Sequence, residues 1–343
     1  MVHRLEELTE QHSAKCCTSS TYKSIFYFVA ILATIHFILL VLWYRHPALI
    51  DSIGITPRNN SQIFSPRITG NVFLIILINT IPKNVERRMT LRKTWVGTAN
   101  GGPMTSNLDL KVHRDLGVYC VFMVAVSDVL SDNKKLHNEA ARYNDILRIN
   151  TVESYRNMIT KVWGGYEWAF KLNPRFFMKT DDDIYVDLPH LVHWLHDPSL
   201  PRKLYAGWVL HHGRVMRNPG NDWYVSHADF HERYYPDYCI GPFYVLSGSL
   251  LGNILTNKKN VKMFNVEDAY LGVLLRYLHV SPLNVGKTFV WEPRLPSMLP
   301  NWENEKFSEV ICLGERLTDK LLRYIHLKYE YIHKTAEYKY ISG

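Results

Sequence analysis

The stretch that decides the fold is RFFMKTDDDIYVD, residues 175–187. It begins as a short apolar strand and runs directly into Asp181, Asp182 and Asp183. If the backbone is extended there, Asp181 and Asp183 point to one side of it. Carboxylates at the carboxyl end of a buried strand suit Mg²⁺ or Mn²⁺, which such sites bind together with substrate phosphates. The alternative is an acidic turn that caps the next helix.

Apolar runs with the length of buried strands alternate with helical segments around this stretch. Residues 72–78 (VFLIILI) and 117–126 (GVYCVFMVAV) have the continuous apolar character of strands buried on both faces of a parallel sheet. Helices are predicted for residues 85–95, 130–143 and 154–172, the last with apolar residues at helical spacing. This alternation predicts βαβ units and an α/β fold, in which ligands bind beyond the carboxyl ends of the strands.

An uncharged apolar run near the N-terminus predicts one membrane span. Residues 25–44 (IFYFVAILATIHFILLVLWY) would extend about 30 Å as a helix, the thickness of the hydrocarbon core. The alternatives are a buried core helix and a cleaved signal peptide, but the run is long for a signal and ends without small residues. We therefore predict a cytosolic tail (1–24), a signal-anchor (25–44), a stem (45–70) and a lumenal body (71–343), as in a single-pass type II membrane protein.

Composition and charge limit the class of protein further. The chain has 343 residues, of which 47% are hydrophobic and 21% charged, which excludes a disordered, collagenous or multi-span chain. The formal net charge is +8, and all of it lies beyond residue 44, because the tail is balanced and the run uncharged. A basic balance suits acidic partners, but Lys and Arg do not cluster in a tract, so we do not predict nucleic-acid binding.

Two kinds of covalent modification are expected if the body is lumenal. Asn59 belongs to the sequence Asn-Asn-Ser, an acceptor for N-glycosylation. The body contains Cys120, Cys239 and Cys312, which in an oxidising compartment predicts one disulfide and one buried thiol. The spacing of these cysteines does not select the bonded pair.

A basic helical segment follows the first predicted strand. In RRMTLRKTW (87–95), Arg88 and Arg92 are four residues apart and share one helix face. Guanidinium groups match the geometry of phosphate oxygens, although a solvated helix face is the simpler interpretation. The position of this segment, on the same sheet edge as the aspartates, favours contact with a phosphate-bearing ligand.

Two further segments each allow two interpretations. Glu267 and Asp268 begin an apolar helical run, so they either stabilise the helix N-terminus or supply a general base. The aromatic segment 235–247, marked by Pro and Gly, is predicted to be a tight loop that either carries a sugar platform or packs into the core.

Taken in order, these motifs resemble the β-1,3-galactosyltransferase family. Related enzymes include β-1,3-N-acetylglucosaminyl- and N-acetylgalactosaminyltransferases and, more distantly, the fringe enzymes. The resemblance covers about residues 70–330. The motifs that carry it are RRMTLRKTW (87–95), ESYRNMITK (153–161), RFFMKTDDDIYVD (175–187), YYPDYCIGPFYVLS (234–247) and VEDAYLG (266–272).

The resemblance implies a fold, a cofactor and a chemistry. It implies a GT-A-like, Rossmann-type mixed sheet flanked by helices. By the family's motifs, Asp268 would be the catalytic base that deprotonates the acceptor hydroxyl as it attacks the donor sugar with inversion. Asp183 would bind Mn²⁺, with Mg²⁺ as a possible substitute, together with His326; His333 is the alternative histidine.

The resemblance also assigns the nucleotide contacts and the disulfide. Arg88 and Arg92 would lie at the nucleotide end of the site, as would Asp181 and Asp182. Cys239 would pair with Cys312.

The implied reaction is β-1,3 transfer of a hexose to a glycan on a glycoprotein or glycolipid, at the Golgi membrane. The donor would be UDP-galactose, the sugar that names the family, or a UDP-N-acetylhexosamine. The donor is left open because residues 240–243 (IGPF) replace the small residues usual after the family's loop cysteine. The alternatives are a β-1,3-N-acetylglucosaminyltransferase and an inactive, lectin-like or chaperone-like relative, although Asp183 and Asp268 are both intact.

Overall fold

The computed structural model describes residues 64–100 and 116–342, with a few isolated residues of the predicted span: Tyr27, Ala30, Ile31 and Thr34. The predicted tail, most of the predicted span and the predicted stem up to residue 63, including Asn59, lie outside the described residues. Across the described residues, none of the helices combines the length and the apolar character needed to span a bilayer.

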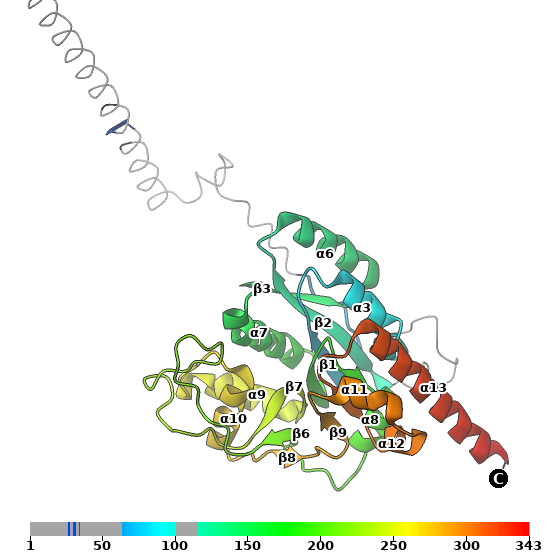
Figure 1. Cartoon of the computed structure of the whole chain (residues 1–343). Coiled ribbons are helices and arrows are strands. Elements are labelled where there is room, and N and C mark those ends of the chain that lie inside the picture. Colours follow the sequence, from blue (N-terminus) through cyan, green and yellow to red (C-terminus); the bar gives the residue numbers. More distant parts are fainter. Residues whose placement is uncertain (1–26, 28–29, 32–33, 35–63, 101–115, 343) are drawn as a thin grey trace, which may run out of the picture. The chain divides into compact units, whose positions relative to one another are not determined.

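A mixed sheet of seven strands forms the centre of the body, in the order β3-β2-β1-β4-β7-β6-β8 (Figure 1). The first four strands of this order are parallel, β7 runs antiparallel to β4 and β6, and β8 runs parallel to β6. The strands are β1 (Leu74–Asn79), β2 (Val118–Val126), β3 (Ile146–Val152), β4 (Phe176–Asp181), β6 (Tyr205–Leu210), β7 (Tyr238–Ser247) and β8 (Leu283–Asn284).

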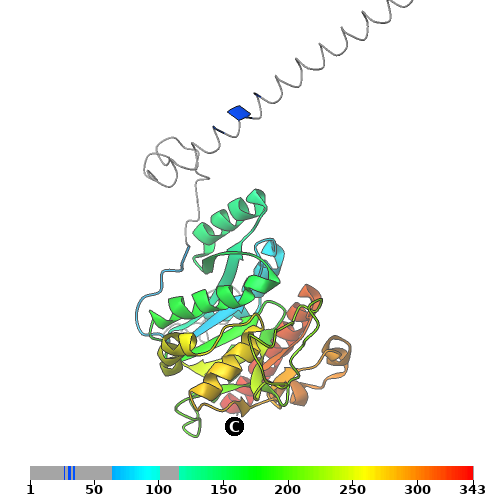
Figure 2. The same cartoon turned by 90° about the vertical axis from the view of Figure 1, so that its left-hand side faces the viewer.

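Helices cover both faces of this sheet (Figures 1 and 2). One core contains side chains of α7, α9 and α10, and the other contains side chains of α3, α4, α6, α8 and α13. Along β1, Leu74, Ile76 and Ile78 enter the second core, whereas Ile75 and Leu77 enter the first. A strand buried on both faces is therefore apolar at every position. The helices are α3 (Val85–Arg92), α4 (Trp95–Asn100), α6 (Leu130–Tyr143), α7 (Met158–Phe170), α8 (Leu188–Leu195), α9 (Gly248–Asn257), α10 (Glu267–Tyr277) and α13 (Asp319–Ser342).

A second, three-stranded sheet brings the C-terminal part of the chain to the aspartate segment. Its order is β5 (Tyr185–Val186), β10 (Cys312–Gly314) and β9 (Phe289–Trp291). Just after β10, the backbone N–H of Arg316 donates to Asp183 Oδ2 at 2.9 Å. Residues far apart in the sequence are thereby placed beside the end of β4.

The mixed α/β class is confirmed, and two local predictions are corrected. The helix predicted for 85–95 is divided between α3 and α4. The predicted loop 235–247 is largely the strand β7. Pro242 is tolerated there because pairing with β4 ends at Phe243, and the register with β6 shifts between Gly207 and Val209.

The body also begins earlier than predicted, since part of the predicted stem packs on it. The Arg148 N–H donates to the carbonyl of Phe64 at 2.9 Å, and the Phe64 ring lies 5.0 Å from that of His137, centroid to centroid. Pro66 is buried. Residues 64–70 are therefore part of the folded body.

The predicted disulfide between Cys239 and Cys312 is wrong. Both side chains are buried without a bond between them. Cys239 belongs to the core that contains α7, α9 and α10, and Cys312 belongs to the core on the other face of the main sheet. The sheet thus separates the two sulfur atoms.

Candidate active site

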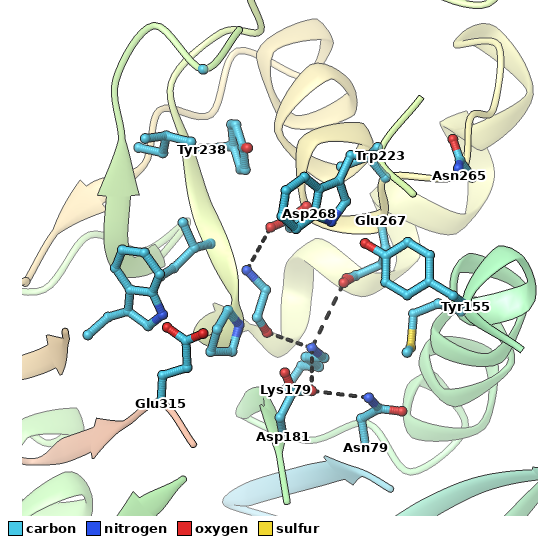
Figure 3. Close-up of a pocket in the computed structure, with 18 of the residues that line it drawn as sticks. Asn79, Tyr155, Lys179, Asp181, Trp223, Tyr238, Asn265, Glu267, Asp268 and Glu315 are labelled. Atoms are coloured by element: carbon cyan, nitrogen blue, oxygen red, sulfur yellow. Dashed lines mark hydrogen bonds and ion pairs between the residues drawn. The ribbon is translucent and has the colours of Figure 1, made fainter. Parts of the chain in front are cut away.

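A pocket of about 620 Å³ opens at the carboxyl ends of β1 and β4 (Figure 3). In α/β proteins this edge of the sheet is where ligands bind. Asn79 at the end of β1 and Asp181 at the end of β4 form one wall, and Asp268 in the first turn of α10 forms another. The two acidic motifs of the sequence therefore meet in one cavity.

The three aspartates alternate in direction as predicted, although only Asp181 belongs to β4 and the next two lie in the turn that follows it. Asp181 and Asp183 line the pocket. Asp182 does not, because its Oδ2 accepts hydrogen bonds from Thr80 Oγ1 at 2.5 Å and from Asn84 Nδ2 at 3.1 Å. Asp182 therefore fixes the aspartate segment to the loop after β1. Its predicted role as a nucleotide contact is corrected to this structural role.

Asp183 is a carboxylate in an unfavourable environment for negative charge. Burial, and then the neighbouring charge of Asp181, raise the pKa of Asp183 to about 6, although the Arg316 N–H opposes this shift. A cation bound at this carboxylate would stabilise its ionised form.

The histidines predicted to bind metal lie elsewhere, so that prediction is wrong. His326 Nδ1 is hydrogen-bonded to the Tyr185 hydroxyl at 2.9 Å, and His333 Nε2 lies 2.9 Å from Asp187 Oδ1. Neither histidine lines the pocket. In the part of the chain that is described, no group of three or more His, Cys, Asp or Glu side chains is arranged to hold a metal ion.

Arg88 and Arg92 form a buried ion-pair cluster instead of contacting the pocket. Arg88 is fully buried, and its Nε and Nη2 donate to the two carboxylate oxygens of Glu139 at 2.8 and 2.7 Å. Arg92 Nε and Nη2 bond the Asp145 carboxylate in the same two-pronged way, and its Nη1 bonds Glu139 at 2.7 Å. Their assignment to the nucleotide is corrected to a structural role: they join α3 to α6 and to Asp145, the residue just before β3.

Asp268 has the geometry of an oriented carboxylate. Its Oδ2 accepts a hydrogen bond from the Gly241 N–H at 2.8 Å, and its Oδ1 accepts one from the Ala269 N–H at 2.8 Å. Burial raises its pKa, and these two N–H groups oppose the shift. A Cβ atom at Gly241 would lie 3.3 Å from Oδ2, so glycine permits this close approach.

A buried lysine, Lys179, joins the two acidic motifs and was missed by the sequence reading. Its Nζ donates to Asp181 Oδ1 at 2.9 Å and to the Gly241 carbonyl at 2.5 Å, and it lies 4.0 Å from Glu267 Oε2 (Figure 3). Burial raises the pKa of Glu267 to about 7, while Lys179 opposes the shift. The available signal was a lysine inside an apolar strand, which requires carboxylate partners when buried.

The sequence also did not predict the aromatic side chains that line the opening of the pocket. Tyr155 and Trp223 line it and are 45% and 54% exposed. Trp291 and Glu315 line it too, and Trp291 Nε1 and Glu315 Oε2 are buried atoms without a hydrogen-bond partner. In Figure 3, Glu315 lies on the opposite side of the pocket from Tyr155 and Trp223.

Comparison with known proteins defines the class of protein. A family model described as "Galactosyltransferase" matches residues 86–285, more than half of the chain. The fold and the acidic pocket agree with a glycosyltransferase. The chain belongs to the galactosyltransferase family.

Similar proteins include several named β-1,3-galactosyltransferases. Beta-1,3-galactosyltransferase 2 of Mus musculus is 28% identical over 258 residues, which are 74% of this chain and 57% of that protein. Beta-1,3-galactosyltransferase 5 of Homo sapiens is 26% identical over 210 residues, 61% of this chain and 64% of that protein. Beta-1,3-galactosyltransferase 9 of Homo sapiens is 28% identical over 222 residues, 63% of this chain and 56% of that protein. The matched region thus spans less than two thirds of these relatives.

Among solved structures, a glycosyltransferase involved in glycosylation of the major capsid of PBCV-1 aligns with 74% of this chain and 98% of its own. The TM-score is 0.36 and the identity 12%, which is too low a similarity to support conclusions about this chain.

Proposed function

We propose that this protein is a β-1,3-galactosyltransferase that transfers galactose from UDP-galactose to a hydroxyl group of a glycan acceptor, with inversion. The observation that carries the proposal is that Asp268 and the pair Asp181 and Asp183 line one pocket from different walls. Membership of the galactosyltransferase family supports it. The acceptor would be a glycan on a glycoprotein or glycolipid.

In the proposed reaction Asp268 is the base. Each of its oxygens accepts one backbone N–H, so each keeps a lone pair, and the raised pKa makes the carboxylate a stronger proton acceptor. The acceptor oxygen gives its proton to Asp268 as it bonds to the anomeric carbon. The bond from that carbon to UDP breaks in the same step, and the electron pair leaves with UDP.

Mn²⁺, or Mg²⁺, is the proposed cofactor, and the donor set of the pocket fits it. Such ions need only one or two protein carboxylates when substrate phosphates complete the coordination. Asp183 and Asp181 would supply these oxygens. Glu315 lines the same pocket, and its Oε2 is buried without a hydrogen-bond partner. When bound, the ion would neutralise charge on the diphosphate leaving group. Asp183→Asn should weaken Mn²⁺-dependent UDP binding by about tenfold or more, measured by calorimetry with and without EDTA.

A donor panel tests the proposed reaction. The purified full chain is incubated with UDP-galactose, UDP-N-acetylglucosamine or UDP-N-acetylgalactosamine, Mn²⁺ and a set of glycan acceptors, and product linkage is read by NMR. A β-1,3-galactosyl product supports the proposal. Preference for UDP-N-acetylglucosamine would select the N-acetylglucosaminyltransferase alternative. Absence of transfer and of donor hydrolysis would select the inactive, lectin-like relative.

We also propose a Golgi location, with one membrane span and a lumenal body. The support is the apolar run 25–44 and the sequon at Asn59. Co-localisation with Golgi markers and a mobility shift after glycosidase treatment would support this topology. An Asn59→Gln variant is the control, because it should migrate like the deglycosylated protein.

A further inference from the structure

A second hollow, of about 750 Å³, adjoins the strand β9 on the C-terminal side of the body. It is lined by His190 and by residues between 286 and 309, including Leu295 and Met298 of α11 (Leu295–Met298) and Lys306 and Ser308 of α12 (Asn304–Ser308). Its volume is within the range of ligand sites in proteins.

The second hollow shares a wall with the proposed active site. Trp291 lines both cavities. It is paired with Gly314 in the small sheet, and the next residue, Glu315, lines the active-site pocket. A chain of sugar residues that leaves the pocket on this side would therefore meet Trp291 and then the second hollow.

The lining of the second hollow suits a neutral, polar ligand with apolar faces. Trp291 and Trp302 are both half-buried, so each indole is fixed by packing and retains exposed surface. Such rings offer a broad apolar face for the C–H surface of a pyranose. The hydroxyls of Thr288 and Ser308 donate to backbone carbonyls of this chain but can each still accept a hydrogen bond. His190 adds an imidazole to the lining.

Four charged side chains line the hollow, with two of each sign: Lys287 and Lys306 are basic, and Glu292 and Glu309 are acidic. Glu292, Lys306 and Glu309 are held in ion pairs. Glu292 Oε1 lies 3.2 Å from Arg294 Nε, and Lys306 Nζ lies 3.1 Å from Glu309 Oε2. The Lys306 ammonium also lies 5.9 Å from the centroid of Trp302. A strongly anionic or cationic ligand would have to break these pairs, whereas an uncharged glycan would not.

The position of the hollow in the sequence distinguishes it from the family's common region. Apart from His190, every lining residue follows residue 285, where the family match ends. The residues proposed for metal binding and catalysis, Asp183 and Asp268, both precede residue 285. The hollow is built almost entirely from residues after 285, outside the region that matches the family. It is therefore suited to distinguish one acceptor from another.

We propose that this hollow is an acceptor subsite, which binds the inner residues of an extended, uncharged glycan whose terminal residue lies at Asp268. The glycan would pass over Trp291 and rest against Trp302. The inference deepens the proposed function and depends on it. The subsite would make the enzyme prefer oligosaccharide acceptors to monosaccharides.

The test compares acceptors of different length with the full chain. A methyl glycoside of the terminal sugar chosen by the acceptor panel is compared with an uncharged tetrasaccharide that carries the same terminal residue. We expect the tetrasaccharide to give at least about tenfold higher kcat/KM. Trp302→Ala should abolish this advantage and leave the value for the monosaccharide unchanged.

Two further variants separate the subsite from general damage. Met298 lines the hollow and is 40% exposed, so Met298→Arg fills it without removing core packing and should also abolish the advantage. Trp223→Ala, in the active-site pocket, should lower kcat/KM for both acceptors. Saturation-transfer NMR should detect contacts with the inner sugars in the wild type that are lost in Met298→Arg.

The outcomes are distinguishable. An unchanged ratio between the two acceptors in both Trp302→Ala and Met298→Arg overturns the subsite while the proposed function stands. Equal kcat/KM for both acceptors in the wild type would also overturn the subsite and leave the proposed function standing. Absence of transfer to every acceptor overturns the proposed function, and the subsite with it.

Discussion

Replacing Lys179 with methionine tests the link between the two acidic motifs. Methionine retains most of the apolar stem and removes the ammonium group. The change leaves the carboxylates of Asp181 and Glu267 without their shared cation, and the Gly241 carbonyl without its donor. Breaking a buried ion pair on one side costs about 3–5 kcal/mol, a large part of the 5–15 kcal/mol that stabilises a typical domain.

The cost should depend on pH in a defined direction. The pKa of Glu267 is raised to about 7 in the folded state, so between its ordinary pKa and pH 7 the folded chain binds more protons than the unfolded chain. Stability contributed by this group therefore falls as the pH rises through that interval. Without Lys179 the folded pKa would rise further, and each unit of pKa corresponds to about 1.4 kcal/mol. The variant should lose more stability at pH 8 than at pH 5.5.

The assay is urea unfolding at these two pH values, followed by tryptophan fluorescence. Lys161→Met is the matched control, because Lys161 is also buried and paired, with Glu153 at 2.7 Å, but does not line the pocket. Both variants should be destabilised. Lys179→Met alone should also lower kcat, measured at a urea concentration below the unfolding midpoint of the variant. The reason is that Lys179 bonds the carbonyl of Gly241, whose N–H orients Asp268.

Two results would refute the reasoning. One is an urea midpoint for Lys179→Met at pH 8 that equals that of the wild type. The other is a loss of stability that is the same at both pH values. The double variant Lys179→Met/Glu267→Gln should recover part of the loss at pH 8, because the uncompensated charge has been removed.

Three further predictions follow from the same geometry. Asp268→Asn should retain UDP affinity in calorimetry and lose about 10²–10⁴-fold in kcat; undiminished turnover would remove Asp268 from the role of base. Glu139→Gln should lower the free energy of unfolding by about 3 kcal/mol with UDP affinity unchanged, whereas a selective loss of UDP affinity would restore a nucleotide role for Arg88 and Arg92. Dithiothreitol should leave the melting temperature unchanged, because Cys239 and Cys312 are not bonded; a marked decrease would contradict this.

The sequence predicted what depends on short-range periodicity. The prediction that Asp181 and Asp183 share one side, apart from Asp182, agrees with the lining of the pocket. The backbone differs from the predicted strand, because β4 ends at Asp181 and the next two aspartates lie in a turn. The continuous apolar run 72–78 likewise predicted a strand between two cores. In both cases the residues that determine the structure are neighbours in the sequence.

What the sequence did not predict depends on partners far along the chain. Arg88 and Arg92 share a helix face whether that face meets phosphate, solvent or carboxylate, and the deciding residues, Glu139 and Asp145, lie about fifty positions away outside any motif. Similarly, Pro and Gly in segment 235–247 indicated a loop, because the irregular partner strand that accommodates Pro242 has no sequence pattern of its own.

The two interpretations of Asp268, helix stabilisation and catalysis, are compatible in the structure. The carboxylate lies in the first turn of α10, where it accepts the Ala269 N–H, as an acid at a helix N-terminus does. That bond and the one from Gly241 lower its pKa against the effect of burial. They favour the ionised form, and only an ionised carboxylate can accept a proton. The interaction that stabilises the helix therefore also prepares the proposed base, whereas the adjacent Glu267 accepts the Tyr244 hydroxyl at 2.6 Å and faces Lys179.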